Sequence, residues 1–294
     1  MEDQIVRALS SAGGIRALAC SAGKLTREIC SLQQTSATAS IALGRGLAAG
    51  ALMGALLKQS QRVALKFEGN GPLHKLLIEA DSDGAVRGRA GNPAAEAEPL
   101  DNSWNVPGIL GRAGFLTVTK DLGMGGEPYR GMVQLRTSEI GDDLAYYLTA
   151  SEQIPSVVGV GAALDAVGMV SVCGGFLAQA LPLADKAEIE EIMARITALP
   201  SLSGLLQEGG PKALLTSIFG EIPYILLETH EIFFRCGCSQ EKVERALLSF
   251  GPDELNDMVK RKEGTEVTCE FCRQTYHLDA PAIEQLRSSK ALTV

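Results

Sequence analysis

Cys236-Gly-Cys238 and Cys269-Glu-Phe-Cys272 are the stretches of this sequence that say most about its organisation. Thirty residues separate the two pairs, and together they hold four of the seven cysteines. Four thiolates in a tetrahedron are a preferred ligand set for zinc, and each short pair can supply two of them from one turn of backbone. The sequence therefore predicts one Zn²⁺ bound by Cys236, Cys238, Cys269 and Cys272.

One spacing departs from the usual structural zinc site. A single residue separates Cys236 from Cys238, whereas two to four residues are typical between paired ligands. Cysteines two positions apart also lie within the Cα range of a disulfide, so this pair could instead close a small ring. Four inert, buried thiols are a further interpretation. His277, five residues after Cys272, could also replace one cysteine as a ligand.

The cysteine segments resemble the redox-switch domain of the redox-regulated heat-shock holdase family, the thirty-three-kilodalton chaperonins. The resemblance rests on residues 234–247 (FRCGCSQEKVERAL), 267–272 (VTCEFC) and 276–279 (YHLD). Six other blocks also look like that family, so the resemblance extends over essentially the whole chain. These blocks are 44–49 (GRGLAA), 121–124 (DLGM), 128–131 (PYRG), 142–147 (DDLAYY), 151–155 (SEQIP) and 174–177 (GGFL).

The resemblance implies a function and a switch. It implies an ATP-independent holdase whose reduced, zinc-bound form is inactive. Oxidation would release zinc and form the disulfides Cys236–Cys238 and Cys269–Cys272. The linker and the switch domain would then unfold and expose apolar surface to unfolding client proteins, commonly as a homodimer. Cys20, Cys30 and Cys173 lie outside the family motif; we expect them to be buried, and they leave further disulfides open.

Composition and charge favour a folded protein of the cytoplasm. Of the 294 residues, 46% are hydrophobic and 21% are charged, with a net charge of −8. Residues 232–294 hold nine Lys and Arg against ten Asp and Glu, which disfavours the alternative of a zinc-ribbon nucleic-acid module, since phosphate binding needs clustered cations. A purely structural zinc module stays open. The acidic start, residues 1–4, lacks the pattern of a signal peptide, and seven cysteines fit a reducing compartment.

Motifs that carry catalysis are absent from the sequence. No glycine-rich stretch is followed by Gly-Lys-Ser/Thr, and neither HExxH nor GxSxG occurs. His74, His230 and His277 are far apart, so nothing local suggests a nucleophile and its base. A catalytic zinc also keeps an open position, whereas four cysteines close the coordination shell. We therefore predict no catalytic residues and no enzyme activity.

The predicted architecture is α+β in three parts: a mixed core domain (1–180), an amphipathic helical linker (181–231) and a small zinc-binding domain (232–294). In the core domain we expect helices across 2–31 with glycine interruptions, an Ala/Gly-rich helix at 36–57, and a helix capped by Ser138 that ends at Ala150. Three hairpins are expected there, with their strands at 75–80 and 85–89, 115–120 and 132–136, and 157–164 and 169–177; a further strand is expected at 62–68.

The Ala/Gly-rich run at 36–57 has the length and the GxxxGxxxG pattern of a membrane span. Ala and Gly gain little on leaving water, so we expect instead a helix packed closely inside the protein, and no membrane partner.

The linker and the last domain follow. We expect an amphipathic helix at 185–199, two shorter helices at 201–207 and 212–219, and a strand at 224–235. About a dozen large apolar side chains in the linker must lie on another surface, most simply the first domain. Helices at 239–248, at 252–259 and from Pro281, with strands at 266–268 and 274–277, complete a domain that is too small to stay folded without its metal.

Overall fold

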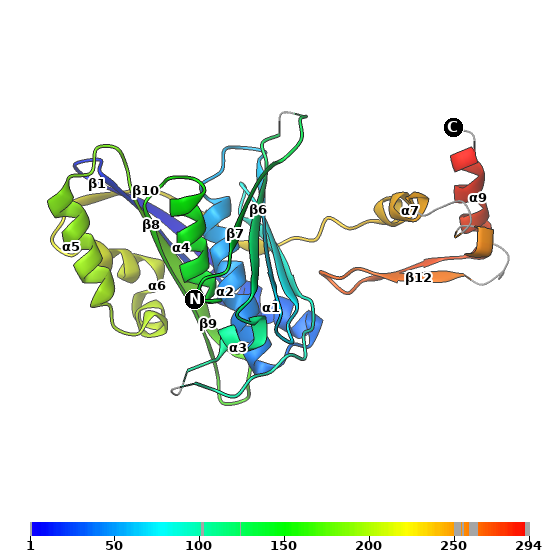
Figure 1. Ribbon diagram of the computed structural model, residues 1–294, viewed down its shortest axis with the longest axis horizontal. Helices are drawn as coiled ribbons and strands as arrows, with labels where there is room; N and C mark the ends of the chain where they lie inside the picture. Colours follow the sequence, from blue (N-terminus) through cyan, green and yellow to red (C-terminus); the bar gives the residue numbers. More distant parts are fainter. Residues whose placement is uncertain are drawn as a thin grey trace. The chain divides into compact units, whose positions relative to one another are not determined.

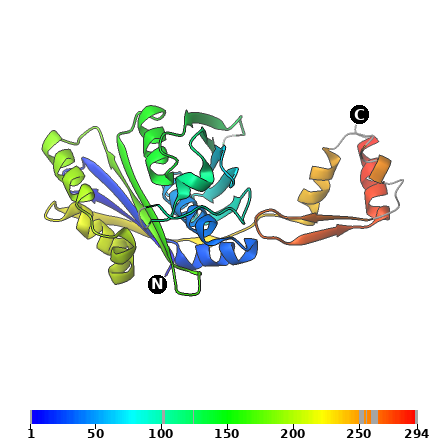
Figure 2. The same ribbon diagram turned by 60° about the horizontal axis from the view of Figure 1, so that its bottom comes forward.

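The computed structural model describes residues 2–100, 103–123, 125–249, 254, 256–258 and 264–291 (Figures 1 and 2). The chain divides into two units, Met1–Arg235 and Cys236–Val294, which we call the core unit and the cysteine unit. Helices and strands occur in both units, so the predicted α+β class is confirmed.

A five-stranded antiparallel sheet forms one layer of the core unit. Its β8–β9 pair is the hairpin predicted at 157–164 and 169–177. β10 comes late in the chain, yet it pairs with the first strand. The strands in spatial order are β10 (Tyr224–Glu231), β1 (Gln4–Ser10), β2 (Ile15–Ser21), β9 (Val170–Ala180) and β8 (Ser156–Leu164).

A six-stranded sheet forms the second layer. The hairpins predicted around 82–84 and 123–126 are confirmed as β4–β5 and β6–β7, and the strand predicted at 62–68 is β3. β11 runs parallel to β5, whereas the other neighbours are antiparallel. The strands in order are β11 (Phe233–Phe234), β5 (Ala85–Ala90), β4 (Lys75–Asp81), β3 (Arg62–Gly69), β6 (Gly114–Asp121) and β7 (Tyr129–Gln134).

The helix α2 (Ala37–Gly54) lies between the two sheets and is almost wholly buried (Figure 2). It approaches the six-stranded sheet closely: a Cβ atom on Gly46 would lie 2.7 Å from Leu76, and one on Gly50 would lie 2.4 Å from Ile78. The Ala/Gly-rich run is therefore a packed internal helix, as predicted. No helix in the described part of the chain has both the length and the apolar character needed to cross a bilayer.

The helices predicted across 2–31 are wrong for its first part. The structure has β1 and β2 there, joined by a turn at Gly13 (φ 76°), before the helix α1 (Gly23–Gln33). Ala, Leu and Arg in this stretch favour a helix by propensity. β1 is nevertheless an inner strand, hydrogen-bonded to β2 on one side and to β10 on the other. Pairing with a distant strand overrides the local preference.

The predicted cap at Ser138 is also wrong. The helix α4 (Ile140–Ala150) begins after Glu139. Ser138 has a positive φ of 62°, and its hydroxyl donates a hydrogen bond to the Gly111 carbonyl, just after the short helix α3 (Val106–Leu110). An N-cap residue has extended backbone, as Glu139 does here, and the left-handed backbone of Ser138 does not fit that position.

The segment predicted as a linker, 181–231, lies in the core unit. Its helices α5 (Lys186–Thr197) and α6 (Leu202–Phe219) pack on the five-stranded sheet (Figure 1). α6 is kinked at Gly210 (φ 66°), so its two parts correspond to the two predicted short helices. Asp185 caps α5 by accepting a hydrogen bond from the Glu188 amide, 2.8 Å away.

The contact between these helices and the sheet is a second apolar core, which we call the linker-docking core. Its sheet side consists of small and β-branched residues and one phenylalanine, and its helix side of larger residues. The buried members are Val6, Ala8, Ile15, Ala17, Ala19, Val172, Phe176 and Ala178 from the sheet, and Ile192, Leu206, Leu214, Leu215, Ile218 and Phe219 from the helices.

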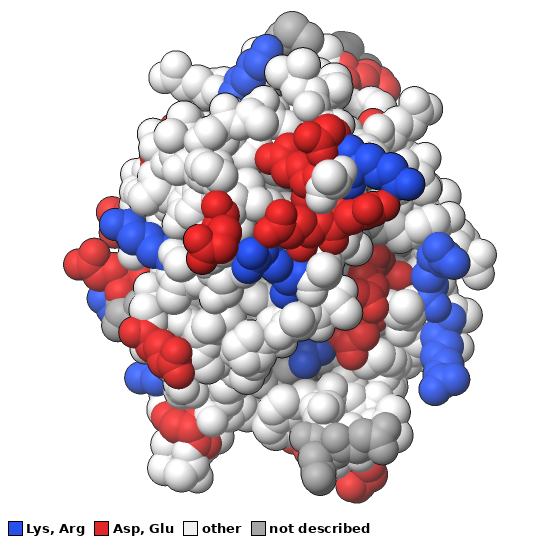
Figure 3. Space-filling view, turned by 90° about the vertical axis from the view of Figure 1, so that its left-hand side faces the viewer, with Lys and Arg blue, Asp and Glu red and all other residues white. Residues whose placement is uncertain are grey.

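The helix α5 carries more acidic than basic side chains, and Lys186 and Arg195 form ion pairs with Glu190 and Glu191 on its outer surface. Glu190 and Glu191 are exposed, and Figure 3 shows Asp and Glu side chains gathering on the side of the core unit that carries this helix. A surface with this charge does not favour a polyanion such as nucleic acid. α5 is therefore amphipathic as predicted, with one face on the sheet and a charged face outward.

The cysteine unit is a hairpin with two helices. β12 (Thr265–Thr268) pairs antiparallel with β13 (Thr275–Leu278), and α7 (Gln240–Leu248) packs against α9 (Ala280–Ala291). The strands and these helices are as predicted. Within the helix predicted at 252–259, residues 254 and 256–258 are described and helical, and the others lie outside the described residues. The buried apolar side chains described in this unit are Val243, Leu247, Leu278 and Ile283.

Candidate metal centre

Turns at the ends of the secondary structure elements carry the two cysteine pairs. Cys236 and Cys238 lie between β11 and α7, and Ser239 caps α7 by accepting from the Lys242 amide at 3.3 Å. Cys269 and Cys272 lie in the turn of the β12–β13 hairpin. The strands and the helix cap thus hold both pairs in a defined backbone.

The structure brings all four sulfurs together. They lie within 4.8 Å of one another, with Cys236 Sγ 3.6 Å from Cys269 Sγ and Cys238 Sγ 3.4 Å from Cys272 Sγ. Zinc–sulfur bonds of about 2.3 Å in a tetrahedron place sulfurs about 3.8 Å apart. All four thiols are free, at separations well above the roughly 2.05 Å of a disulfide bond. The residues present therefore fit a tetrahedral metal ion.

Electrostatics point to the same conclusion. Burial, together with hydrogen bonds to the neighbouring cysteines, raises the pKa of the Cys272 thiol to about 12. Four thiols at these distances cannot all ionise without a compensating cation, because each thiolate disfavours the next. A bound divalent ion would supply that charge, and the four thiolates would hold it in a closed shell.

Tyr276 is a residue at this site that the sequence did not single out as functional. Its hydroxyl donates a hydrogen bond to Cys238 Sγ over 3.0 Å, and this bond raises the pKa of Tyr276 to about 12. Tyr276 lies on β13, four residues after Cys272, so only the fold of the hairpin against the first pair makes the contact. The sequence signal was its place in the block 276–279 that carries the family resemblance, but that block gives no role for the hydroxyl.

His277 does not join the sulfur cluster. Its Nδ1 lies 3.1 Å from Glu266 across the hairpin, and both side chains are exposed. Within the part of the chain that the structure describes, the four cysteines form the one group of His, Cys, Asp and Glu suited to a metal ion. The geometry therefore favours the four-cysteine set over a set with histidine.

The other three cysteines are buried along one face of α2. Cys173 Sγ lies 3.2 Å from the Gly44 carbonyl, Cys20 Sγ 3.9 Å from the Ala48 carbonyl, and Cys30 Sγ 4.0 Å from the Ser40 carbonyl. Burial raises the pKa of all three thiols, to about 12 for Cys173. As expected, they are core residues, and their protonated, enclosed sulfurs are poor nucleophiles.

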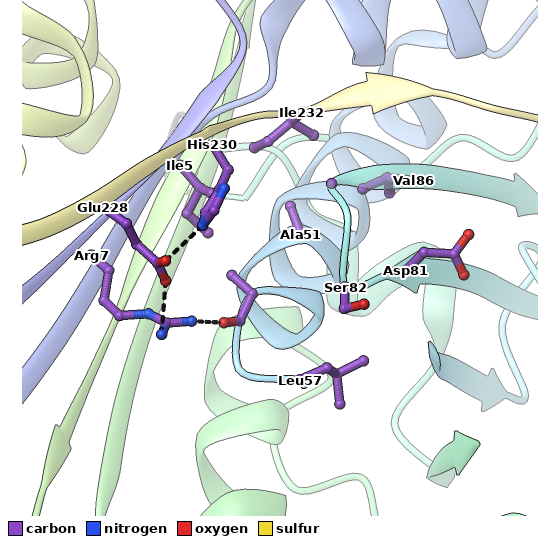
Figure 4. A pocket seen from close by; sticks show the side chains of 12 residues that line it. Ile5, Arg7, Ala51, Leu57, Asp81, Ser82, Val86, Glu228, His230 and Ile232 are labelled. Atoms are coloured by element: carbon purple, nitrogen blue, oxygen red, sulfur yellow. Dashed lines mark hydrogen bonds and ion pairs between the residues drawn. The ribbon is translucent and has the colours of Figure 1, made fainter. Parts of the chain in front are cut away.

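The segment that leads to the first cysteine pair is held by side-chain contacts at two places in the core unit. The first lies beside a cavity of about 190 Å³, where β10 faces the C-terminal end of α2 (Figure 4). There Arg7 lies 2.8 Å from Glu228 and also donates to the Ala55 carbonyl, while Glu228 lies 2.9 Å from His230. These contacts connect the linker segment to the end of the central helix.

The second fastening lies directly before Cys236. The Arg235 guanidinium is 2.8 Å from both Asp81 and Asp83 at the β4–β5 turn, and hydrogen bonding to Arg235 lowers the pKa of Asp83. The Phe233 amide donates to the Gly84 carbonyl at 3.1 Å, where β11 joins the six-stranded sheet. These contacts therefore hold the chain in place up to Arg235, the last residue of the core unit.

Comparisons with known proteins agree with this fold and site. The family model described as Hsp33 protein matches residues 3–279. The chain belongs to the Hsp33 family. A 33 kDa chaperonin of Pelobacter propionicus is 63% identical over 293 residues, covering 100% of this chain and 96% of the relative. A 33 kDa chaperonin of Geobacter sulfurreducens is 49% identical, covering 98% and 95%.

A solved Hsp33 structure shares the architecture. The crystal structure of the 33 kDa chaperonin (heat shock protein 33 homolog) from Thermotoga maritima matches with a TM-score of 0.90 at 34% identity, covering 99% of each chain. The resemblance seen in the sequence is thus confirmed over the whole chain, and Hsp33 is a chaperone family.

Proposed function

We propose that this protein is a redox-regulated, ATP-independent holdase that binds unfolding proteins during oxidative stress and heat. The reduced form, with Zn²⁺ held by Cys236, Cys238, Cys269 and Cys272, is the inactive one. Oxidation to the disulfides Cys236–Cys238 and Cys269–Cys272 removes the metal ligands and activates the protein. Clients are unfolded or partly folded chains, the active form is a homodimer, and the site of action is the cytoplasm.

The observation that carries this proposal is that the cysteine unit combines a four-sulfur site with a very small apolar core. Four converging sulfurs sit in a unit in which only four apolar side chains are described as buried. A core of that size supplies little stability, whereas a structural zinc site contributes roughly 10–16 kcal/mol. Losing the sulfur ligands therefore unfolds this unit, and the core unit keeps its own large apolar core.

The chemistry is thiol oxidation by a peroxide or hypochlorous acid. Each disulfide forms when two cysteine sulfurs give up two electrons, which reduce one molecule of hydrogen peroxide to two of water. The pairs Cys236–Cys238 and Cys269–Cys272 are close in sequence, so each can still meet after the unit has unfolded. In the reduced structure, sulfurs of different pairs lie only 3.6 Å and 3.4 Å apart, which suits metal binding by all four.

Unfolding of the cysteine unit weakens the attachment of the linker, residues 181–231, to the five-stranded sheet. β10 is an edge strand of the five-stranded sheet, and Ile225, Leu226 and Leu227 on it are each about half exposed. When β10, α5 and α6 leave the sheet, both sides of the linker-docking core face water. Each large apolar side chain in it is worth roughly 1.5–3 kcal/mol on burial, and non-native clients offer such burial. The functional parts are thus 1–180, 181–231 and 232–294.

Aggregation of a thermally unfolding client tests the proposal. We expect peroxide-treated, zinc-free protein at mild heat to suppress light scattering, and reduced, zinc-loaded protein to leave it unchanged. Zinc release, followed with a colorimetric chelator, should accompany the loss of four thiols, and far-UV circular dichroism should report the lost structure. A Cys173→Ala variant is the matched control, because it removes a thiol outside the site.

Three results would overturn the proposal. Oxidised protein that does not slow aggregation would exclude a redox-activated holdase. Zinc that stays bound under excess peroxide would indicate a static structural zinc module instead, and binding of a nucleic acid that weakens with salt would favour the zinc-ribbon alternative.

A further inference from the structure

Tyr276 joins the two halves of the candidate metal centre. It lies on β13 opposite Val267 on β12, in the hairpin that carries the second cysteine pair. Its hydroxyl nevertheless donates to Cys238 of the first pair, over 3.0 Å. Its ring packs against the buried apolar side chains of the cysteine unit. The packing of the ring and the register of the hairpin together place the hydroxyl beside the Cys238 sulfur.

A hydrogen bond to a thiolate changes its reactivity. The donor takes up electron density from the sulfur lone pair that would attack an oxidant, and it occupies space beside that sulfur. Outer hydrogen bonds of this kind tune the basicity of metal ligands. When the basicity of a thiolate falls, the logarithm of its rate of attack falls by about half as much, so a less basic sulfur reacts more slowly with the oxidant.

We propose that Tyr276 is a positioning residue that slows the oxidation of Cys238 relative to the other three cysteines. The inference rests on the proposed redox function of the site. Tyr276 does not touch the oxidant; it acts through the sulfur atom to which it donates. In the reduced protein it raises the oxidant dose at which the first pair reacts.

The step that Tyr276 slows is the attack of Cys238 on peroxide. The Cys238 sulfur forms a bond to one peroxide oxygen, the O–O bond breaks, and the leaving hydroxide is protonated to water. The resulting sulfenic acid condenses with the Cys236 thiol, forming the disulfide and releasing a second water. A disulfide sulfur carries no charge and accepts a hydrogen bond weakly, so the tyrosine hydroxyl is released as the step completes.

The test compares Tyr276→Phe with Thr275→Val in the full-length, zinc-loaded protein. The first variant removes only the hydroxyl that contacts sulfur. The second removes a hydroxyl on the same strand that lies 3.1 Å from the Thr268 hydroxyl, and it leaves the bond between Tyr276 and Cys238 in place. The oxidation rate of each cysteine is measured under excess hydrogen peroxide by differential alkylation and mass spectrometry.

We expect Tyr276→Phe to speed the oxidation of Cys238 roughly threefold to tenfold relative to Cys269. Thr275→Val should leave that ratio unchanged. Equal acceleration of all four cysteines in Tyr276→Phe would show that the hydroxyl only stabilises the hairpin, and an unchanged Cys238 rate would exclude any effect. Either result overturns the proposal.

A spectroscopic readout covers the case of an unstable variant. With cobalt(II) in place of zinc, loss of a hydrogen bond to a thiolate should move the sulfur-to-metal charge-transfer band to longer wavelength in Tyr276→Phe alone. These readouts do not depend on chaperone activity. If oxidised wild-type protein failed to suppress aggregation while Cys238 still responded to Tyr276→Phe, the holdase function would be wrong and the role of Tyr276 would stand.

Discussion

Different interactions stabilise the interior of each of the two units of this protein. The core unit buries α2 between two sheets and adds a separate linker-docking core beneath α5 and α6. The cysteine unit has a few buried side chains and four converging sulfurs. A large apolar core loses stability gradually, one contact at a time, whereas a ligand set is lost as a whole. In the proposed function, this difference makes the smaller unit the sensor and the larger unit the stable base.

Removing one ligand should have the largest effect. Cys272→Ser leaves three thiolates and forfeits much of the roughly 10–16 kcal/mol that a structural zinc site supplies. We expect the amides of 264–288 to lose hydrogen-exchange protection, while those of α2 keep theirs. Cys173→Ala, in the core unit, should leave the cysteine unit protected. A folded cysteine unit in Cys272→Ser, or in protein treated with a chelator, would remove the contrast between the units.

The contact of the linker with the sheet should come second. Phe219 is fully buried and stacks on Tyr224, with ring centroids 4.5 Å apart. Phe219→Ala should weaken this docking by about 3–5 kcal/mol. We expect faster hydrogen exchange across 186–219, and a lower temperature at which oxidised protein suppresses aggregation.

Leu183→Ala is the control for that variant, because Leu183 is 75% exposed and its truncation removes little buried surface. If exchange in α5 and α6 were the same in Phe219→Ala as in the wild type, the linker would not depend on the linker-docking core.

The fastening at Arg235 should matter less. Its side chain is about half exposed, and exposed ion pairs contribute roughly 0.2–1 kcal/mol each. Arg235→Gln should increase exchange of the Phe233 amide a few-fold in the reduced protein. Arg62→Gln is the matched control, since Arg62 also pairs with Asp81, at 2.5 Å, without touching β11. Equal effects of the two variants would show that the aspartates, and not Arg235, stabilise this strand.

The smallest expected effect is that of pH. Hydrogen bonding to Arg235 lowers the pKa of Asp83 in the folded state. The stabilisation is therefore fully present above the unfolded pKa of about 3.9, and is lost as the pH falls through the lower, folded value. The ratio of the hydrogen-exchange rates of the Phe233 amide in Arg235→Gln and in the wild type should stay constant from about pH 5 to 8. It should approach one in acid. A ratio that varied between pH 5 and 8 would contradict the role of the pair between Arg235 and Asp83.

Patterns within a short stretch predicted a large part of this structure. Hairpin signals such as Ser82-Asp83-Gly84 place their own turns, and Ser239 and Asp185 cap the helices they precede. The Ala/Gly run of α2 was predictable because small residues announce close packing. Each of these features depends on residues only a few positions apart, so the sequence contains its cause.

What the sequence by itself determined was the α+β class, the amphipathic helix α5 with its apolar stripe, and the two cysteine pairs as one candidate metal centre. Tertiary structure decided that β1 and β2 form strands, because one partner of β1, the strand β10, lies more than two hundred residues later. It also decided that Ser138 contacts Gly111 and that Tyr276 donates to Cys238. The physical reason is range: propensity, capping and ligand spacing act along the chain, whereas strand pairing and side-chain contacts depend on which distant segments meet.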